Sequence, residues 1–223
     1  MKSIKTMMGV IGMTMVVLAS WAAAADLTDI TLPTPRKEGG KPLMQALKER
    51  QSARAFSTKT LPVQVVSDLL WAAFGINRLD SGKRTAPSAR NWQEVDVYAI
   101  MEGGSYHYDA KANTLKAVAK GDLRKLTGTQ EFVITAPLNL VYVADITRMK
   151  GAAPEDQALY SGADVGFISQ NVYLFCASEG LATVVRGSVD RNALAEALNL
   201  PEQKRIILTQ TVGYPRLMGN VNR

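Results

Sequence analysis

The feature that most constrains the fold of this sequence is one long helical segment that ends in a glycine. Residues Tyr160 to Glu179 are predicted to form the longest helix of the chain, and Gly180 follows as a C-terminal cap. Two apolar runs of strand length come after it, Leu181 to Val185 and Ile206 to Val212, with a helix expected around residues 192–198 between them. Helices and strands that alternate in this way predict one α+β domain.

The segments before this helix continue the alternation of helices and strands. Apolar residues recur at helical spacing after two prolines, and they alternate with polar residues or form short apolar runs further along the chain. The predicted helices cover residues 42–50 and 63–75, and the predicted strands cover residues 95–101, 105–108 and 138–144. Residues 78–84 are polar and contain glycine, so we expect them to form a loop.

The first residues have the layout of a secretory signal. Lys2 and Lys5 form a short basic start, an uncharged apolar stretch follows, and alanines occupy positions 22–25. We expect cleavage near Ala25 and therefore a periplasmic or secreted protein. The alternative is an uncleaved membrane anchor, because about 20 uncharged residues can just span a bilayer. The chain is thus divided into a signal peptide at 1–25, a linker at 26–41 and a folded domain at 42–223.

Composition excludes several classes of active site. One cysteine, Cys176, excludes an intramolecular disulfide framework, and together with one histidine, His107, it leaves poor material for a zinc site. A single histidine also disfavours Ser/His/Asp and Cys/His hydrolases. We interpret His107, which stands on the predicted hairpin, as structural or exposed. The formal net charge of +6 suits an anionic cofactor or substrate, but the sequence has no basic run typical of a nucleic-acid binder.

Three segments, far apart in the sequence, carry the candidate chemistry. In residues 49–57, ERQSARAFS, Arg50 and Arg54 offer guanidinium groups that match phosphate oxygens or a ring carbonyl. Residues 86–93, APSARNWQ, offer amide donors and acceptors. Residues 180–188, GLATVVRGS, end a buried strand at a glycine, which allows a backbone N–H to approach a flat ligand. Each segment alone also fits a solvated helix end, a polar loop or a strand-to-loop glycine.

Together and in this order, the three segments resemble those of the nitroreductase-like FMN flavoproteins. The family motifs Arg-x-Ser-x-Arg/Lys-x-Phe and Pro-Ser-(Ser/Ala)-x-Asn-x-Gln are met by Arg50, Ser52, Arg54 and Phe56 and by Pro87, Ser88, Ala89, Asn91 and Gln93. The long helix and the ending VGYP also fit. The pair Gln170-Asn171 is similar to the branch that contains thiazoline and oxazoline dehydrogenases, although their adjacent Lys-Tyr pair is absent. The resemblance implies a three-layer α+β fold with a central, mostly antiparallel sheet flanked by helices, and a homodimer.

The resemblance also implies which residues bind FMN. Arg50 and Ser52 would hold the phosphate with Arg216, and Arg54 would lie at the pyrimidine edge of the ring, where a fixed cation stabilises the reduced flavin. The third segment would lie beside flavin N5, with an arginine where many relatives have a glutamate, so that the local field becomes more positive. The second segment would come from the other subunit. The implied cofactor-binding residues are Arg50, Gln51, Ser52, Arg54, Pro87, Ser88, Ala89, Asn91, Val185, Arg186, Gly187 and Arg216.

These assignments predict an FMN-dependent oxidoreductase that transfers a hydride through flavin N5 in a ping-pong reaction. A small-molecule donor, with NADH or NADPH as the candidates, and a small acceptor are the expected partners, with no nucleic acid. Membrane contact is expected only through the signal segment if it stays uncleaved. Two alternatives remain open: an exported flavin-binding protein without NAD(P)H-dependent turnover, and a basic periplasmic binding protein with no cofactor.

The long helix bears on the implied homodimer. Gly162, Gly166 and Ser169 form a stripe of small residues, which more often serves the core of a monomer than a contact between two helices. We interpret Asp164, within the same helix, as a solvated residue rather than as the partner of an arginine.

Overall fold

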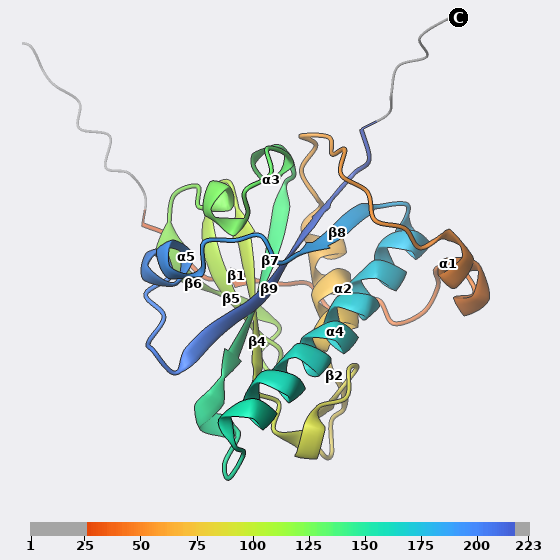
Figure 1. The fold of residues 1–223 in the computed structure, drawn as a ribbon. Helices are drawn as coiled ribbons and strands as arrows, with labels where there is room; N and C mark the ends of the chain where they lie inside the picture. Colours follow the sequence, from red (N-terminus) through yellow and green to blue (C-terminus); the bar gives the residue numbers. More distant parts are fainter. Residues whose placement is uncertain (1–25, 217–223) are drawn as a thin grey trace, which may run out of the picture.

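An antiparallel sheet of seven strands runs through the middle of the molecule (Figure 1). The structure is a computed structural model, which describes residues 26–216 of the chain. In sheet order the strands are β1 (Ile30–Thr31), β6 (Thr114–Lys120), β5 (Gly104–Asp109), β4 (Val95–Met101), β7 (Leu138–Asp145), β9 (Lys204–Gly213) and β8 (Ala182–Arg186). All neighbouring strands of this sheet are antiparallel, so the predicted architecture of the sheet is confirmed.

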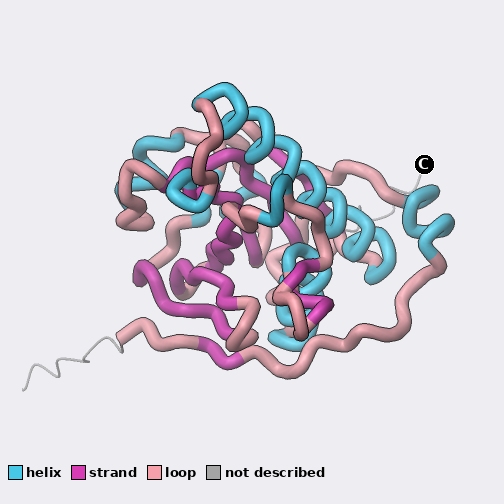
Figure 2. Tube along the Cα trace, turned by 90° about the horizontal axis from the view of Figure 1, so that it is seen from below, coloured by secondary structure: helices cyan, strands magenta, loops and turns pink. Residues whose placement is uncertain are grey.

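Helices cover both faces of the sheet and complete three layers. On one face lie α2 (Val63–Phe74) and the long helix α4 (Pro154–Glu179), which runs across the strands in both views (Figures 1 and 2). On the other face lie α3 (Phe132–Thr135) and α5 (Arg191–Ala197). The helix α1 (Leu43–Glu49) packs against α4.

Strand β4 shows how the sequence supplies both faces of this sheet. Val97 and Ala99 pack in the core with α2 and α4, whereas Tyr98 and Ile100 pack in the core with α5. Successive side chains of a strand point to opposite faces, so the run of apolar residues from Val97 to Met101 is covered on both sides. The predicted three-layer fold is therefore built on central strands whose two faces are both buried.

The long helix ends where it was predicted to end but begins earlier. Gly180 adopts the left-handed conformation, with φ of 69°, and caps α4. The helix starts at Pro154 rather than near Tyr160, and Glu155 and Asp156 occupy its first turn. Proline and acidic residues suit the first turn of a helix, because the N–H groups there lack partners within the helix and the dipole favours negative charge. This polar turn carries no apolar periodicity, which is why the prediction placed the start too late.

Two regions expected to lack secondary structure contain short strands. β1 lies within residues 26–41, the expected linker, and pairs with β6, a strand that the sequence analysis did not predict. Arg36 in the same region forms an ion pair of 2.7 Å with the buried Asp68 of α2. β2 (Ile76–Arg78) and β3 (Lys83–Arg84) form a hairpin in the expected loop. These strands are too short or too polar to show a two-residue period.

The expected signal peptide, residues 1–25, lies outside the described residues, so its cleavage stays a prediction. Between residues 26 and 216, no helix is both long enough and apolar enough to cross a bilayer.

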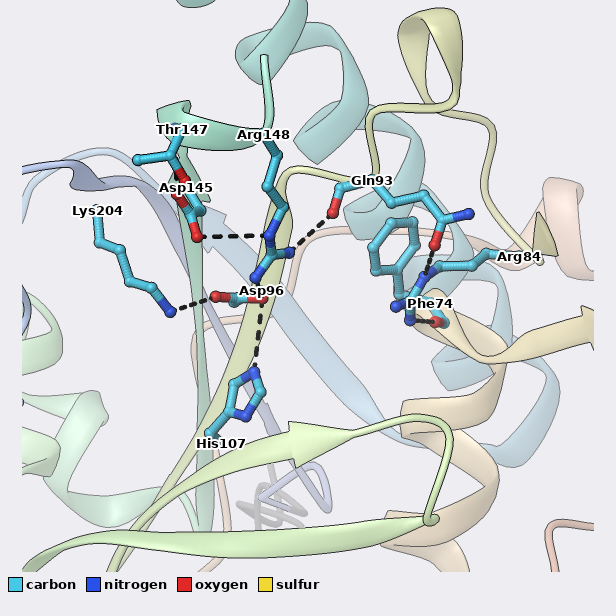
Figure 3. A network of polar contacts seen from close by, with 9 residues as sticks. All are labelled: Phe74, Arg84, Gln93, Asp96, His107, Asp145, Thr147, Arg148 and Lys204. Carbon is cyan, nitrogen blue, oxygen red and sulfur yellow. Dashed lines mark hydrogen bonds and ion pairs between the residues drawn. The ribbon is translucent and has the colours of Figure 1, made fainter. Parts of the chain in front are cut away.

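A buried aspartate ties neighbouring strands together at one end of the sheet (Figure 3). Asp96 of β4 accepts hydrogen bonds from Arg148, after β7, at 2.8 Å and from Lys204 of β9 at 2.7 Å, and His107 Nε2 of β5 lies 3.5 Å away. Burial raises the pKa of Asp96, but the hydrogen bonds and the two cations outweigh burial and hold it well below its ordinary value of 3.8. His107 thus makes a structural contact.

We expect Asp96→Asn to lower the free energy of unfolding by about 2 kcal/mol at neutral pH, because hydrogen bonds to a charged group are lost. The pKa of Asp96 is lower in the folded than in the unfolded protein, so its stabilisation is present above pH 3.8 and is lost as the pH falls further. Urea unfolding followed by tryptophan fluorescence at pH 7 and pH 3 measures this. We expect the loss of unfolding free energy in Asp96→Asn to be smaller at pH 3 than at pH 7. An equal loss at both pH values, or the same loss in the exposed control Asp80→Asn, contradicts the prediction.

Candidate functional site

The segment that follows α1 runs in extended form along the edge of the sheet, beside β8 (Figure 1). The N–H of Ala53 donates to the carbonyl of Thr183 in β8 at 2.9 Å, and the N–H of Arg216, after β9, donates to the carbonyl of Ala55 at 3.1 Å. The buried ring of Phe56 anchors the segment. The structure therefore places the first predicted segment next to the third one and next to Arg216.

A cavity of about 520 Å³ opens beside this segment, between α1 and the end of α4. Its lining includes Lys48, Arg50, Gln51, Tyr173, Thr183 and Pro215. Within residues 26–216, neither Arg50 nor the exposed Arg54 forms an ion pair with a carboxylate. Their charges are available to an anionic ligand at this edge of the sheet.

Tyr173 of α4 joins the first predicted segment to the third. Its hydroxyl lies 2.8 Å from Ser52 Oγ and accepts a hydrogen bond of 3.0 Å from the N–H of Val185. The N–H of Val185, expected to lie beside the cofactor, is therefore engaged by Tyr173. No local sequence signal marks this tyrosine as functional, because an aromatic residue at an apolar position of a helix is ordinarily a core residue.

The side chain of Arg186 lies inside the protein, on the face of the sheet that α3 covers. Its guanidinium donates to the carbonyl of Thr127 at 2.7 Å and to Asn139 Oδ1 at 3.0 Å. It also lies 5.7 Å from the ring centre of Phe132 in α3. Burial lowers the pKa of Arg186 to about 10. The charge that was expected to act on the cofactor is thus held by buried neutral groups, while the backbone at Gly187 stays exposed.

The second predicted segment lies at a different point along α4. The N–H of Ala89 donates to Asp164 at 3.0 Å, whereas Ser52 contacts Tyr173. At 1.5 Å per residue, Asp164 and Tyr173 are about 13 Å apart along the helix axis. Within one chain, the loop with Pro87, Ser88, Ala89 and Asn91 is therefore separate from the other two segments.

This loop contains several residues in the left-handed region. Arg90, Asn91 and Gln93 have φ values of 50°, 54° and 47°. Each such conformation costs of order 1 kcal/mol for a residue with a side chain, so the loop persists only where its surroundings hold it. Gln93 itself accepts a hydrogen bond of 2.7 Å from Arg84 (Figure 3). The backbone N–H of Gln93 donates to Ser88 Oγ at 2.8 Å.

Two buried carboxyl groups accept hydrogen bonds from the loop. Asp164 is only 2% exposed and Glu94 is fully buried, so the interpretation of Asp164 as solvated is wrong. Ser88 Oγ donates to Glu94 at 3.2 Å, and the carboxyl groups of Glu94 and Asp164 contact each other. Burial and then the neighbouring charge of Asp164 raise the pKa of Glu94 above its ordinary value of 4.5, because two adjacent buried carboxylates repel each other.

The two glycines of the small-residue stripe of α4 face outward. A Cβ atom built on Gly162 or Gly166 would have no neighbour within 4 Å, so the monomer-core interpretation is wrong for both glycines. Leu159 and Phe167, on the same side of the helix, are 64% and 48% exposed. Ser169, the third member of the predicted stripe, is buried.

Comparison with known proteins places this geometry in a family. The model of the nitroreductase family matches residues 47–214. A protein of Methanocaldococcus jannaschii named as a nitroreductase is 27% identical over an alignment of 176 residues, which covers 74% of this chain and 88% of that protein. A solved structure from Ralstonia eutropha, also named as a nitroreductase, is 43% identical, has a TM-score of 0.82 and covers 86% of this chain and 91% of its own.

The fold is shared more widely than the sequence. The NADPH:FMN oxidoreductase of Vibrio harveyi, solved with NAD⁺, has a TM-score of 0.57 at 21% identity, with 78% of this chain and 68% of that chain covered. At this identity the likeness concerns the fold.

We expect Glu94→Gln to raise the free energy of unfolding by about 1 kcal/mol at pH 7, because glutamine can accept from Ser88 and donate to Asp164 without a buried second charge. The pKa of Glu94 is raised in the folded protein, so its ionisation destabilises the fold as the pH rises above 4.5. The gain is therefore expected to vanish near pH 4. Thermal unfolding at both pH values measures this, with the exposed Glu102→Gln as control; a less stable Glu94→Gln at pH 7 contradicts the argument.

Proposed function

Because this chain belongs to the nitroreductase family, we propose that it is an FMN-dependent oxidoreductase that passes electrons from NADH or NADPH to a small organic acceptor. One observation carries the proposal: segment 50–56 lies beside Arg216 and the end of β8, next to a cavity of about 520 Å³. Among residues 26–216, Arg50, Arg54 and Arg216 form no ion pair with a carboxylate, and such unpaired guanidinium groups suit a phosphate dianion joined to a flat ring.

Different residues are assigned to different parts of the cofactor. Arg50 lines the cavity and is assigned to the phosphate, together with Ser52 and Arg216. Arg54 is assigned to the pyrimidine edge of the ring, where a fixed cation stabilises the negative charge of the reduced flavin. When bound, FMN supplies the hydride transfer in two separate half-reactions, which is the ping-pong order. The exposed backbone at Gly187 is the group of the third segment best placed to approach the ring.

The proposed active unit is a homodimer. Two observations support it: the loop at residues 87–91 is separate from segment 50–56 within one chain, and the side of α4 that carries Gly162 and Gly166 is exposed beside Phe167. Small residues allow close approach of two helices, and the exposed apolar side chains gain burial in such a contact. In this dimer the loop of each subunit completes the flavin site of the other.

Two finer assignments are part of the proposal. We place the chain in the branch that contains thiazoline and oxazoline dehydrogenases, on the pair Gln170-Asn171, without the Lys-Tyr pair that those enzymes use. We also propose that residues 1–25 are a signal peptide cleaved near Ala25, so that the enzyme acts in the periplasm or outside the cell.

The proposal predicts different defects for two neighbouring arginines. Arg50→Ala is expected to weaken FMN binding about thirtyfold, or about 2 kcal/mol, because a charged hydrogen bond to phosphate is lost. Arg54→Ala is expected to retain flavin but to slow its reduction about a hundredfold, the usual cost of one fixed electrostatic contact. Titration of flavin fluorescence and rapid-mixing measurements of flavin bleaching separate the two defects, with Arg205→Ala as a surface control.

Several outcomes of this experiment contradict the proposal in different ways. Protein that binds no flavin from replete cells removes the cofactor assignment and favours a binding protein without cofactor. Protein that binds FMN but is reduced by neither NADH nor NADPH favours the flavin-binding alternative. If Arg54→Ala is reduced as fast as the wild type at equal flavin content, the electrostatic role of Arg54 is wrong.

The dimer is tested by overpacking its proposed contact. Gly166→Leu places a large side chain on the exposed face of α4, which leaves the monomer fold intact because nothing lies within 4 Å of a Cβ atom there. We expect the variant to weaken dimerisation by about 1–3 kcal/mol and to lose bound FMN in parallel. Sedimentation velocity and flavin content measure both effects, with Lys111→Leu as the control. A stable monomer with full flavin content contradicts the shared site.

A further inference from the structure

The hydroxyl of Tyr173 lies between two segments that the proposed cofactor site uses. It contacts Ser52 Oγ at 2.8 Å on one side and the N–H of Val185 at 3.0 Å on the other. Ser52 is exposed and Tyr173 is half-buried at the wall of the 520 Å³ cavity. The contact joins residues that are 121 positions apart in the sequence, so it is a tertiary contact specific to this fold.

A chain of hydrogen bonds runs from the N–H of Val185 through the Tyr173 hydroxyl to the hydroxyl of Ser52. A backbone N–H can only donate, so the Tyr173 oxygen accepts from Val185. Either hydroxyl can donate in the contact between Tyr173 and Ser52, and an anion bound at Ser52 selects the order in which Tyr173 donates to Ser52 Oγ. In that order Ser52 gives its own proton to the anion, and hydrogen bonds in such a chain polarise one another. The exposed end of the chain is therefore a hydroxyl that can donate to an anion while it accepts from Tyr173.

The ring of Tyr173 also contacts the neighbouring cation. The guanidinium carbon of Arg50 lies 5.4 Å from the centre of the ring. Such a contact restricts the position of an arginine without neutralising its charge, because the face of the ring carries only a partial negative charge. One side chain of α4 thus orients both a hydroxyl and a guanidinium at the same end of the cavity.

We propose that Tyr173 is a positioning residue of the cofactor site, which holds Ser52 as a hydrogen-bond donor to the phosphate group and is not itself in contact with the flavin ring. This inference rests on the proposed FMN site. Its consequence is that the Tyr173 hydroxyl acts on phosphate binding through Ser52, so removal of either hydroxyl removes the same contact.

A double-mutant cycle tests this coupling. Deflavinated wild type, Tyr173→Phe, Ser52→Ala and the double variant are titrated with FMN and with riboflavin, which lacks the phosphate. We expect each single variant to weaken FMN binding about tenfold, and the double variant to weaken it about tenfold rather than a hundredfold, because residues that act as one unit are not additive. Riboflavin binding is expected to change less than threefold throughout.

The control removes a tyrosine hydroxyl elsewhere in the fold. Tyr106→Phe lies on β5, which β4, β7 and β9 separate from β8, and is expected to leave FMN binding unchanged. Thermal unfolding of each variant shows that it is folded. If Tyr173→Phe fails to fold, Ser52→Ala and Ser52→Thr carry the test: threonine keeps the hydroxyl and is expected to bind FMN within threefold of the wild type.

Each result supports or overturns the inference. Equal FMN affinity of Tyr173→Phe and the wild type overturns it while the proposed function stands. Additive losses in the double variant, or equal losses for riboflavin and FMN, also overturn it, because Tyr173 then acts independently of Ser52 and the phosphate. In the fallback comparison, Ser52→Ala with the FMN affinity of the wild type overturns it too. A wild-type protein that binds no FMN overturns both this inference and the proposed function.

Discussion

The helix α4 is fixed against the central sheet by three completely buried side chains, Val165, Ile168 and Val172. The candidate groups are attached to this helix at different positions along its axis. Near one end, Asp164 holds the loop that begins at Pro87, and near the other end Tyr173 holds Ser52. A helix rises by a constant 1.5 Å per residue, so the distance between these two attachment points is set by the chain itself. Loops move easily, but these two segments are each tied to the same buried element.

The molecule contains two contrasting kinds of charged group: buried charges with partners inside the protein, and accessible charges without such partners among residues 26–216. Asp96 is buried and is matched by two cations, and the buried guanidinium of Arg186 is held by two neutral oxygens. Such groups are costly to leave unpaired, so their partners lie within the protein. Arg50 and Arg54 stand at the accessible edge of the sheet and have no such partner among residues 26–216. Water can solvate these cations, and an anionic ligand can replace that water, which is the physical basis of the phosphate site proposed above.

The sequence predicted those parts of the fold whose pattern is local. Strands such as β7 are apolar at nearly every position. The helix α4 ends at Gly180, a residue type that readily adopts the left-handed conformation of a helix C-cap. β1 and β6 lack that pattern because they lie toward the edge of the sheet. The burial of Asp164 could have been predicted, since it stands four residues before Ile168 and shares its helical face. The contact between Tyr173 and Ser52 could not, because no local periodicity relates a helix to an extended segment so distant in the chain.

The spacing along α4 is compatible with the dimer proposed above, in which a second copy completes the site. In a two-fold dimer, residues equally far from the axis on the two sides lie opposite each other. If two α4 helices cross antiparallel near Phe167, Asp164 of one subunit stands opposite Gln170 of the other, about 5 Å along the axis from that subunit's Tyr173. The separation of about 13 Å within one chain is thereby reduced to one helical turn between chains. The outward glycines, which have no use in the monomer core, allow the approach that this geometry requires.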